Sequence, residues 1–178
     1  MTKKLLITLS ILTLFASCGT RRCPTTFDEG VVINGIRWAT RNVDAPGIFA
    51  QNPESAGGFF TFAEAQNACP QDWRLPTREE LQFLVNADSG WTIKNGVNGR
   101  LFGSGRNQLF LSAAGYRSMP VGGRLGRLNH VGASGNYWGS STSDRVNNSG
   151  SFLWFYGGSS KVIYAYRGFG HSVRCVAK

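Results

Sequence analysis

Hydrophobic residues occur along this chain in short runs that are separated by glycine, asparagine, serine and proline. The first two runs, residues 31–33 and 36–39, are joined by Asn34-Gly35. An Asn-Gly pair favours the tight turn of a two-residue hairpin loop, because both positions tolerate positive φ. The pattern therefore predicts a β-hairpin over residues 31–39.

Two later stretches carry the start signal of a helix. Thr61 is followed three residues on by Glu64, and Thr77 is followed in the same way by Glu80. This spacing is typical of a capping box, in which the two side chains satisfy free backbone N–H groups at a helix start. We expect two short helices, the first of which ends near Cys69-Pro70.

Helix signals fade after Gly90, where glycine and serine become frequent. The stretch 151–168, SFLWFYGGSSKVIYAYRG, has two aromatic-rich runs around residues 157–160, which predict a second hairpin. Both alternating sets of its residues are apolar or aromatic, so the hairpin either is buried on both faces or exposes an aromatic face to a partner. Hairpin, two helices, a long irregular glycine-rich region and closing strands together predict an α+β fold with small antiparallel sheets.

The N-terminal residues predict export. A short basic start is followed by an apolar stretch, residues 5–15, that is too short to span a bilayer as a structural helix. The sequence LFASCG that ends it resembles the lipobox of bacterial lipoproteins, although Phe15 stands where that motif usually has leucine. We expect residues 1–17 to be a signal peptide, Cys18 to be lipidated and residues 18–30 to be a tether. The lipid would anchor the protein to the inner or outer membrane of a bacterial cell envelope.

The length and the charge of the chain indicate how many domains it forms and which kinds of partner it could bind. Removal of 17 residues from the 178 would leave 161, enough for one domain, with 17 basic and 10 acidic residues and a net charge of +7. The arginines are spread singly along the chain instead of forming one stripe. This distribution argues against a nucleic-acid partner and leaves a weak attraction to acidic polymers such as anionic glycans.

The cysteines and histidines do not form a recognisable metal-binding motif. Once Cys18 is lipidated, an oxidising compartment would join two of the other three cysteines and leave one over. Those three are Cys23, Cys69 and Cys175. The two histidines, His130 and His171, are far apart in sequence and no CxxC motif occurs, so the sequence holds no ligand set for zinc. We expect no metal and no other cofactor.

Four motifs, in order along the chain, resemble a known family. They are TFAEAQNACPQDWRLPTREELQFL, LFLSAAGYRS, GNYWGSST and HSVRCVAK, and they resemble the major paralogous-domain lipoproteins of Bacteroidetes and Fibrobacter. The resemblance implies a single domain over residues 31–178 whose core looks like the C-type lectin fold. It also implies a disulfide between the cysteine that ends the first helix and one in the last strand, here Cys69 and Cys175. Cys23 would then be free or in an intermolecular bond.

The same resemblance narrows the function. Calcium-dependent lectins use Glu-Pro-Asn or Gln-Pro-Asp with a Trp-Asn-Asp strand motif, and none occurs here, because QNPES precedes the first helix. We therefore expect no calcium-dependent sugar site. Formylglycine-generating enzymes share the architecture but depend on a reactive cysteine pair, which a Cys69–Cys175 bridge would remove. An enzyme of that type is the most distant alternative, and we expect no catalytic residues.

The C-terminal stretch also resembles the variable region of proteins that are diversified by retroelements and use a C-type lectin-like fold. In such proteins solvent-facing positions vary between fixed residues, which here are Tyr137-Trp138, Leu153, Phe155, Gly170 and Ser172 to Val176. Rigid aromatic side chains among small polar ones suit a binding surface. The ligand-binding positions that this resemblance implies are Asp144, Arg145, Val146, Ser151, Phe152, Trp154, Tyr156, Lys161, Ile163, Tyr164, Phe169 and His171.

The sequence thus predicts an envelope lipoprotein that binds a protein or glycan through an aromatic C-terminal face around Trp154. A paralogue that is not diversified is the alternative to a retroelement variable protein. A further alternative is an adhesin or pilus-associated subunit, in which the aromatic hairpin is a fixed subunit interface. The remaining tryptophans, Trp38, Trp73, Trp91 and Trp138, are expected in the core.

Overall fold

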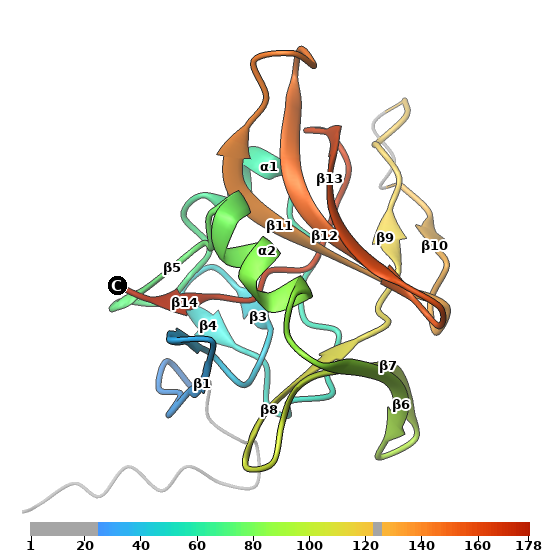
Figure 1. Ribbon diagram of the computed structural model, residues 1–178. Helices are drawn as coiled ribbons and strands as arrows, with labels where there is room; N and C mark the ends of the chain where they lie inside the picture. Colours follow the sequence, from blue (N-terminus) through green and yellow to red (C-terminus); the bar gives the residue numbers. More distant parts are fainter. Residues whose placement is uncertain (1–24, 123–125) are drawn as a thin grey trace, which may run out of the picture.

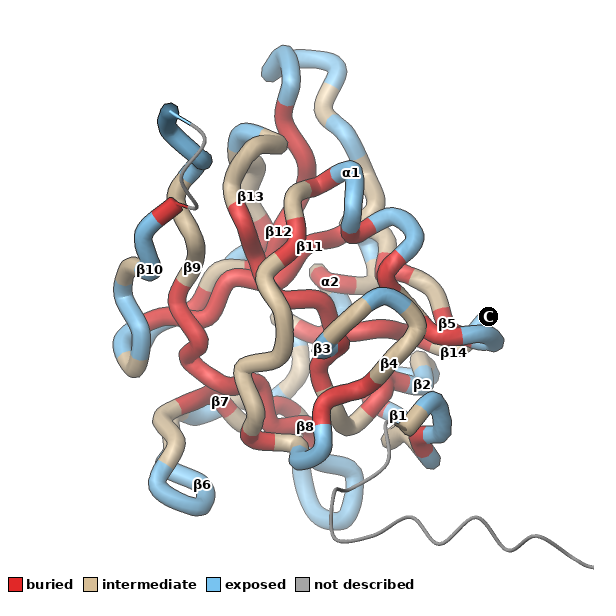
Figure 2. Tube along the Cα trace, turned by 180° about the vertical axis from the view of Figure 1, so that it is seen from behind, coloured by how far each residue is buried: buried red, intermediate tan, exposed pale blue. Residues whose placement is uncertain are grey.

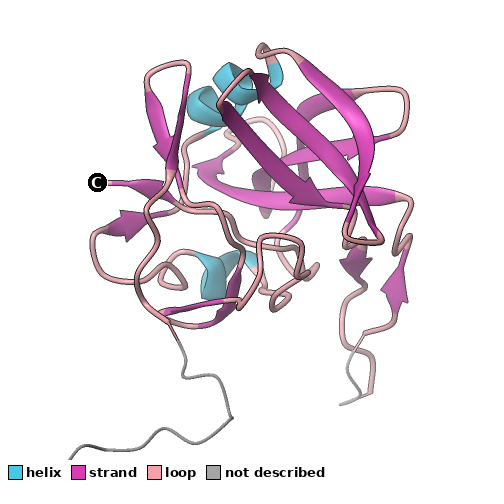
Figure 3. Cartoon of the chain, turned by 90° about the horizontal axis from the view of Figure 1, so that it is seen from below, coloured by secondary structure: helices cyan, strands magenta, loops and turns pink. Residues whose placement is uncertain are grey.

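The computed structural model describes residues 25–122 and 126–178. The predicted signal peptide, Cys18 and Cys23 lie outside these residues. Within the described residues the chain forms two short helices and several small antiparallel sheets, which confirms the predicted α+β class (Figures 1 and 3). Neither of these helices is long and apolar enough to cross a membrane.

The helices are α1 (Phe62–Ala65) and α2 (Arg78–Val85). The strands are β1 (Val31–Ile33), β2 (Ile36–Trp38), β3 (Val43–Ala45), β4 (Ile48–Phe49), β5 (Trp73–Arg74), β6 (Ser89–Lys94), β7 (Val97–Ser104), β8 (Asn107–Ser112), β9 (Tyr116–Arg117), β10 (Leu128–Asn129), β11 (Ser134–Thr142), β12 (Ser149–Tyr156), β13 (Ser160–Tyr166) and β14 (Val176–Ala177). They form the sheets β1-β2-β14-β5, β3-β4, β6-β7-β8, β9-β10 and β11-β12-β13.

The first predicted hairpin and both predicted helices are confirmed. Asn34 and Gly35 connect β1 and β2 with φ of 49° and 81°, the positive values that this turn requires. Both helices begin with a complete capping box, at Thr61 and at Thr77. Helix α1 ends at Ala65, earlier than expected, and turns continue the chain toward Cys69.

The expectation of a long irregular region after Gly90 is wrong for its first part. Residues 89–112 form the meander β6-β7-β8, with continuous antiparallel pairing on both sides of β7. The missed signal is Asn95-Gly96, a second hairpin dipeptide, in which both residues have positive φ. Glycines inside the strands concealed the pattern: a side chain at Gly99 would collide with the Phe110 ring, so packing selects glycine there.

The two ends of the domain lie side by side. The last strand, β14, pairs with β2 on one side and with β5 on the other. Residues 25–30, expected as part of the tether, also contact the domain. Thr25 pairs with Phe49, and the buried Asp28 accepts a hydrogen bond at 3.1 Å from the Arg41 guanidinium.

The sheet β11-β12-β13 divides the interior into two cores. Its first face meets α2 and the meander, and Leu153 and Phe155 pack there with Leu81, Leu84 and Phe102. Its second face meets α1 and the segment before it, and Phe152 and Trp138 pack there with Phe60 and Phe62. Figure 2 shows buried positions along much of β11 and β12, whereas β13 at the edge is mostly intermediate. The sheet is thus covered on both faces over part of its length.

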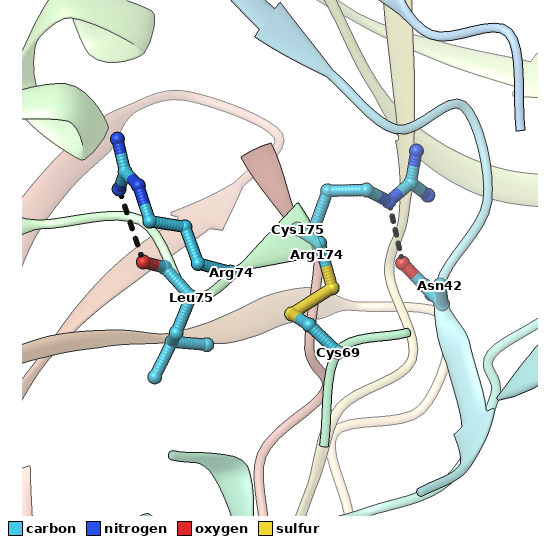
Figure 4. Close-up of a disulfide and its surroundings, with 6 residues drawn as sticks. All are labelled: Asn42, Cys69, Arg74, Leu75, Arg174 and Cys175. Carbon is cyan, nitrogen blue, oxygen red and sulfur yellow. Dashed lines mark hydrogen bonds between the residues drawn. A yellow bond between two sulfur atoms is a disulfide. The ribbon is translucent and has the colours of Figure 1, made fainter. Parts of the chain in front are cut away.

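A disulfide joins the end of the α1 turn to the C-terminal segment. Cys69 and Cys175 are bonded, their Cα atoms are 6.0 Å apart and 106 positions separate them in sequence (Figure 4). The predicted bridge is therefore confirmed. In the chain-entropy account, closing a loop of this length stabilises the folded state by about 4–5 kcal/mol.

A buried arginine lies next to that disulfide. The Arg174 Nε donates to Asn42 Oδ1 at 2.9 Å (Figure 4). The Arg174 Nη1 donates to the Ala39 carbonyl at 3.1 Å. Burial lowers the pKa of the Arg174 guanidinium to about 10, so it stays charged near neutral pH. No carboxylate among the described residues forms an ion pair with it. Neutral oxygens therefore hold a buried charge in place.

Removal of the disulfide should cost a large part of the stability. We expect Cys69→Ser with Cys175→Ser to lower the free energy of unfolding by about 4–5 kcal/mol, because the unfolded chain regains the entropy of an open loop. Urea unfolding with and without reductant measures the change, and reductant should affect only the parent protein. Equal stability of the parent and the double variant would contradict the expectation.

Loss of Asn42 should also destabilise the protein. In Asn42→Ala the Arg174 guanidinium would keep its charge and lose its side-chain acceptor, at a cost on the order of 3 kcal/mol. Asn52→Ala, at an exposed position, is the matched control and should change the unfolding free energy by less than about 0.5 kcal/mol. A similar urea midpoint for both variants would show that the Asn42 contact contributes nothing.

Candidate functional site

The two faces of the C-terminal hairpin follow from its register. Leu153 pairs with Val162 and Trp154 with Lys161, so residues alternate between the first core and the opposite face. All the positions expected as fixed are buried: Tyr137, Trp138, Leu153, Phe155, Gly170 and Ser172 to Val176. Trp38, Trp73 and Trp138 are buried as expected, whereas Trp91 is half-buried at the edge of the first core.

The twelve ligand-binding positions do not form one patch. Asp144, Arg145 and Val146 are exposed, but they lie in the β11–β12 loop, at the opposite end of β12 from the 157–159 turn (Figure 1). Tyr164 lies on the α2 side of the sheet, with the Arg78 guanidinium 5.8 Å from its ring centroid. The half-buried Ile163 and Phe169 pack at the margin of the second core.

Three of those positions are buried, so the expectation that they face solvent is wrong. The exposed fractions are 0% for Ser151, 6% for Phe152 and 2% for His171. The His171 ring lies 4.1 Å from the Trp138 ring and 4.6 Å from the Phe152 ring, between centroids. Residues 60–62 and α1 cover this part of the second face, where Phe62 meets Trp138 at 5.4 Å. Alternation along the strand indicates which way a side chain points, but it does not indicate what covers it.

Three of the predicted positions gather where the cover ends. Trp154 is half-buried, Tyr156 is 43% exposed and Lys161 is exposed. The rings of Trp154 and Tyr156 have centroids 4.9 Å apart, and the Lys161 Nζ lies 4.9 Å from the centroid of the Trp154 ring. We call these three side chains the hairpin-tip strip. They place two aromatic rings and one ammonium group side by side at the surface.

The opposite face of the hairpin holds the strip in position. Phe155 is fully buried and meets Phe102 at 6.0 Å and Trp91 at 6.4 Å, between ring centroids. The Arg100 Nη1 donates to the Tyr156 carbonyl at 3.2 Å, and the turn closes with a bond from Tyr156 N to the Ser159 carbonyl at 3.0 Å. Burial lowers the pKa of the Arg100 guanidinium. The strip therefore projects from a backbone that is bonded and packed on its far side.

A second aromatic cluster was not predicted from the sequence. Tyr116 stacks on His130 at 5.8 Å and meets the edge of Phe169 at 5.6 Å, between ring centroids. Only Phe169 was among the expected positions. The motif GYRS contains Tyr116, but it gives no sign that β9 crosses to Gly170 beside the closing segment. This cluster lies against His171 and extends the covered part of the second face.

The strip offers groups for non-covalent contact. Its two rings have apolar faces, the Tyr156 hydroxyl can donate and accept a hydrogen bond, and the Lys161 ammonium can only donate. A pocket of about 560 Å³ beside β5 and the chain ends and one of about 400 Å³ beside β8 include none of the twelve positions. Within residues 25–122 and 126–178, no three side chains of His, Cys, Asp or Glu come close enough to hold a metal ion.

The buried histidine should make folding sensitive to mild acid. Burial lowers the pKa of His171 from 6.5 to about 3, so between these values the unfolded chain binds a proton that the folded chain does not. Stability is then fully present above pH 6.5 and falls as the pH decreases. We expect His171→Phe to reduce the loss of unfolding free energy between pH of about 6.5 and about 5, measured by urea unfolding.

His130→Phe is the control for that experiment, because His130 is exposed. This variant should keep the pH dependence of the parent protein over the same interval. The comparison uses the slope with pH and not the absolute stability, so a packing change in either variant does not affect it. Identical slopes for His171→Phe and the parent would refute the expectation.

Comparisons with protein-family models, with curated proteins and with solved structures give no match to this chain. The resemblance to the lipoprotein family therefore stays a prediction that rests on the motifs WRLPT, GNYWGSST and HSVRCVAK. Any proposed function therefore has to rest on the positions and contacts of the described residues.

Proposed function

We propose that this protein is a ligand-binding module of the bacterial cell envelope, held by a lipid on Cys18, that contacts a protein or glycan through the hairpin-tip strip. The observation that carries the proposal is the pair of adjacent rings, Trp154 and Tyr156. They lie on the second face of the sheet, beyond the part that residues 60–62 and α1 cover. Buried aromatic anchors supply most of the energy in many binding surfaces.

The rigidity of the hairpin supports this proposal. A binding side chain is most effective when its support is already ordered, because less conformational entropy is lost on contact. Phe155 anchors the strand between the two ring-bearing residues, and Arg100 anchors the tip. Tryptophan and tyrosine also offer large contact areas with few rotatable bonds.

A C-type lectin-like fold for the domain is part of the same proposal. In its favour are two capped helices followed by small antiparallel sheets, and a disulfide from the first helical segment to the residue directly before the closing strand. The two adjacent chain ends also agree with it. Diversification by a retroelement would concern only exposed positions, so Ser151, Phe152 and His171 leave that set.

The proposal is tested by selecting binders and then removing the rings. Binders of the purified full chain are selected from a displayed peptide library and from a glycan array. Trp154→Ala and Tyr156→Ala should each weaken the selected binders by about tenfold or more, because truncating a central aromatic anchor removes most of its contact. Affinity is measured by titration calorimetry.

Phe83→Ala is the matched control, since Phe83 is a 52% exposed aromatic residue on α2. Its removal should leave the affinity unchanged within about twofold. Circular dichroism of each variant should match the parent protein, because neither ring of the strip is deeply buried. Binders that tolerate loss of both Trp154 and Tyr156 would refute the proposed site.

A further inference from the structure

The charges of the chain are divided unequally along its length. Residues 89–178 contain 11 lysines and arginines and a single acid, Asp144. Residues 1–88 contain 8 basic and 9 acidic residues, so the positive net charge of the protein comes from the second segment. This segment builds the meander and the whole sheet β11-β12-β13. The strip belongs to this basic segment, and Lys161 is the single lysine or arginine within strands β11, β12 and β13.

Three of the ten acidic residues form ion pairs that do not involve the strip. Among the described residues three ion pairs form, Arg41 with Asp28, Arg74 with Glu80 and Lys94 with Glu54. Lys161 belongs to none of them. Asp144 lies in the loop at the opposite end of β12, since the register places Ser149 beside Tyr166 and Phe155 beside Ser160. The ammonium of the strip thus has no carboxylate partner in the described part of the protein.

The rings and their surroundings favour a sugar over an apolar ligand. The Tyr156 ring lies near the backbone of the turn, since a Cβ at Gly158 would lie 3.2 Å from a ring carbon. The Tyr156 hydroxyl can donate and accept a hydrogen bond at the edge of the strip, whereas Ser160 pairs with Phe155 and so lies on the opposite face. Two aromatic rings, inclined by 37° to each other and edged by a hydroxyl and an ammonium group, match a molecule with an apolar C–H face and acceptor groups at its rim.

We infer that the ligand of the hairpin-tip strip is an acidic glycan, in which one sugar ring stacks on Trp154 or Tyr156 and a carboxylate or sulfate group pairs with Lys161. This inference rests on the proposed function and names its ligand class. A protein partner of standard size needs about 800 Å² of surface on each side. The strip consists of three side chains, and that size suits a few sugar units better.

The experiment compares sugars that differ in charge. The probes are an oligogalacturonate, the same oligomer after reduction of its carboxyl groups, a sulfated dextran oligomer and polyglutamate. Binding to the purified full chain is measured by calorimetry at low and at physiological ionic strength. We expect the two acidic glycans to bind, the reduced oligomer to bind at least tenfold more weakly, and salt to weaken the binding of the acidic probes.

Variants assign the binding to the strip. Trp154→Ala should weaken oligogalacturonate binding by about tenfold or more. Lys161→Gln should weaken it by about two- to fivefold, as expected for an exposed ion pair, and should reduce its salt dependence. Arg106→Gln removes an equal charge from the exposed β7–β8 turn and should leave the affinity unchanged.

Each other outcome overturns the inference in a different way. Equal binding of charged and reduced oligomers would show a neutral-sugar site and would leave the proposed function intact. Stronger binding of polyglutamate would indicate an acidic polypeptide as the partner. No binding of either acidic glycan would exclude the ligand class, and the library selection above would still decide the proposed function separately. Binding that is insensitive to both Trp154→Ala and Lys161→Gln would exclude the strip itself.

Discussion

The structure depends on a covalent and polar junction beneath its closing strand. The Cys69–Cys175 disulfide joins the helical segment to the C-terminus, and the neighbouring Arg174 hydrogen-bonds Asn42 from the N-terminal part of the chain. Three regions far apart in sequence thus meet at two consecutive residues that come directly before β14. Because the domain has two short helices and many small sheets, few long elements could hold these regions together through packing alone. The junction supplies the long-range order that extended secondary structure supplies in other folds.

The sheet β11-β12-β13 positions the exposed residues of the C-terminal hairpin. One of its faces packs into the first core through Leu153 and Phe155, which fix the hairpin. The other face passes from full burial at Phe152 to exposure at Tyr156 within a few residues of the same strand. The aromatic hairpin is therefore neither a purely internal element nor an open face. Most of the hairpin is buried and its tip is exposed. The proposed binding function involves only the tip, with Trp154, Tyr156 and Lys161.

Local signals in the sequence predicted local structure well. The Asn34-Gly35 turn and both capping boxes follow from properties of adjacent residues, and they agree with the structure. Leu153 and Phe155, expected in the core from the resemblance to retroelement variable regions, are buried. The burial of Phe152 and His171 could not be predicted in this way, because it depends on α1 and Phe60, which lie more than 80 positions earlier. The strands of the meander were missed for a different reason, since glycines such as Gly99 erase the alternation on which strand prediction relies.

The disulfide also determines how the domain would carry mechanical force. If the N-terminus is held at a membrane and a ligand pulls at Trp154, the covalent path runs from Thr25 to Cys69, crosses the bridge to Cys175 and returns through β13 to the hairpin. The other route from Cys69 to Trp154 follows the backbone through α2, the meander and β9 to β11. This route is longer, so the path through the disulfide bears the tension. Under load the first elements to extend would be the small sheets near the chain ends and the β12–β13 pair. Helix α2 and the meander would keep their shape while the molecule remains stretched between its two attachments.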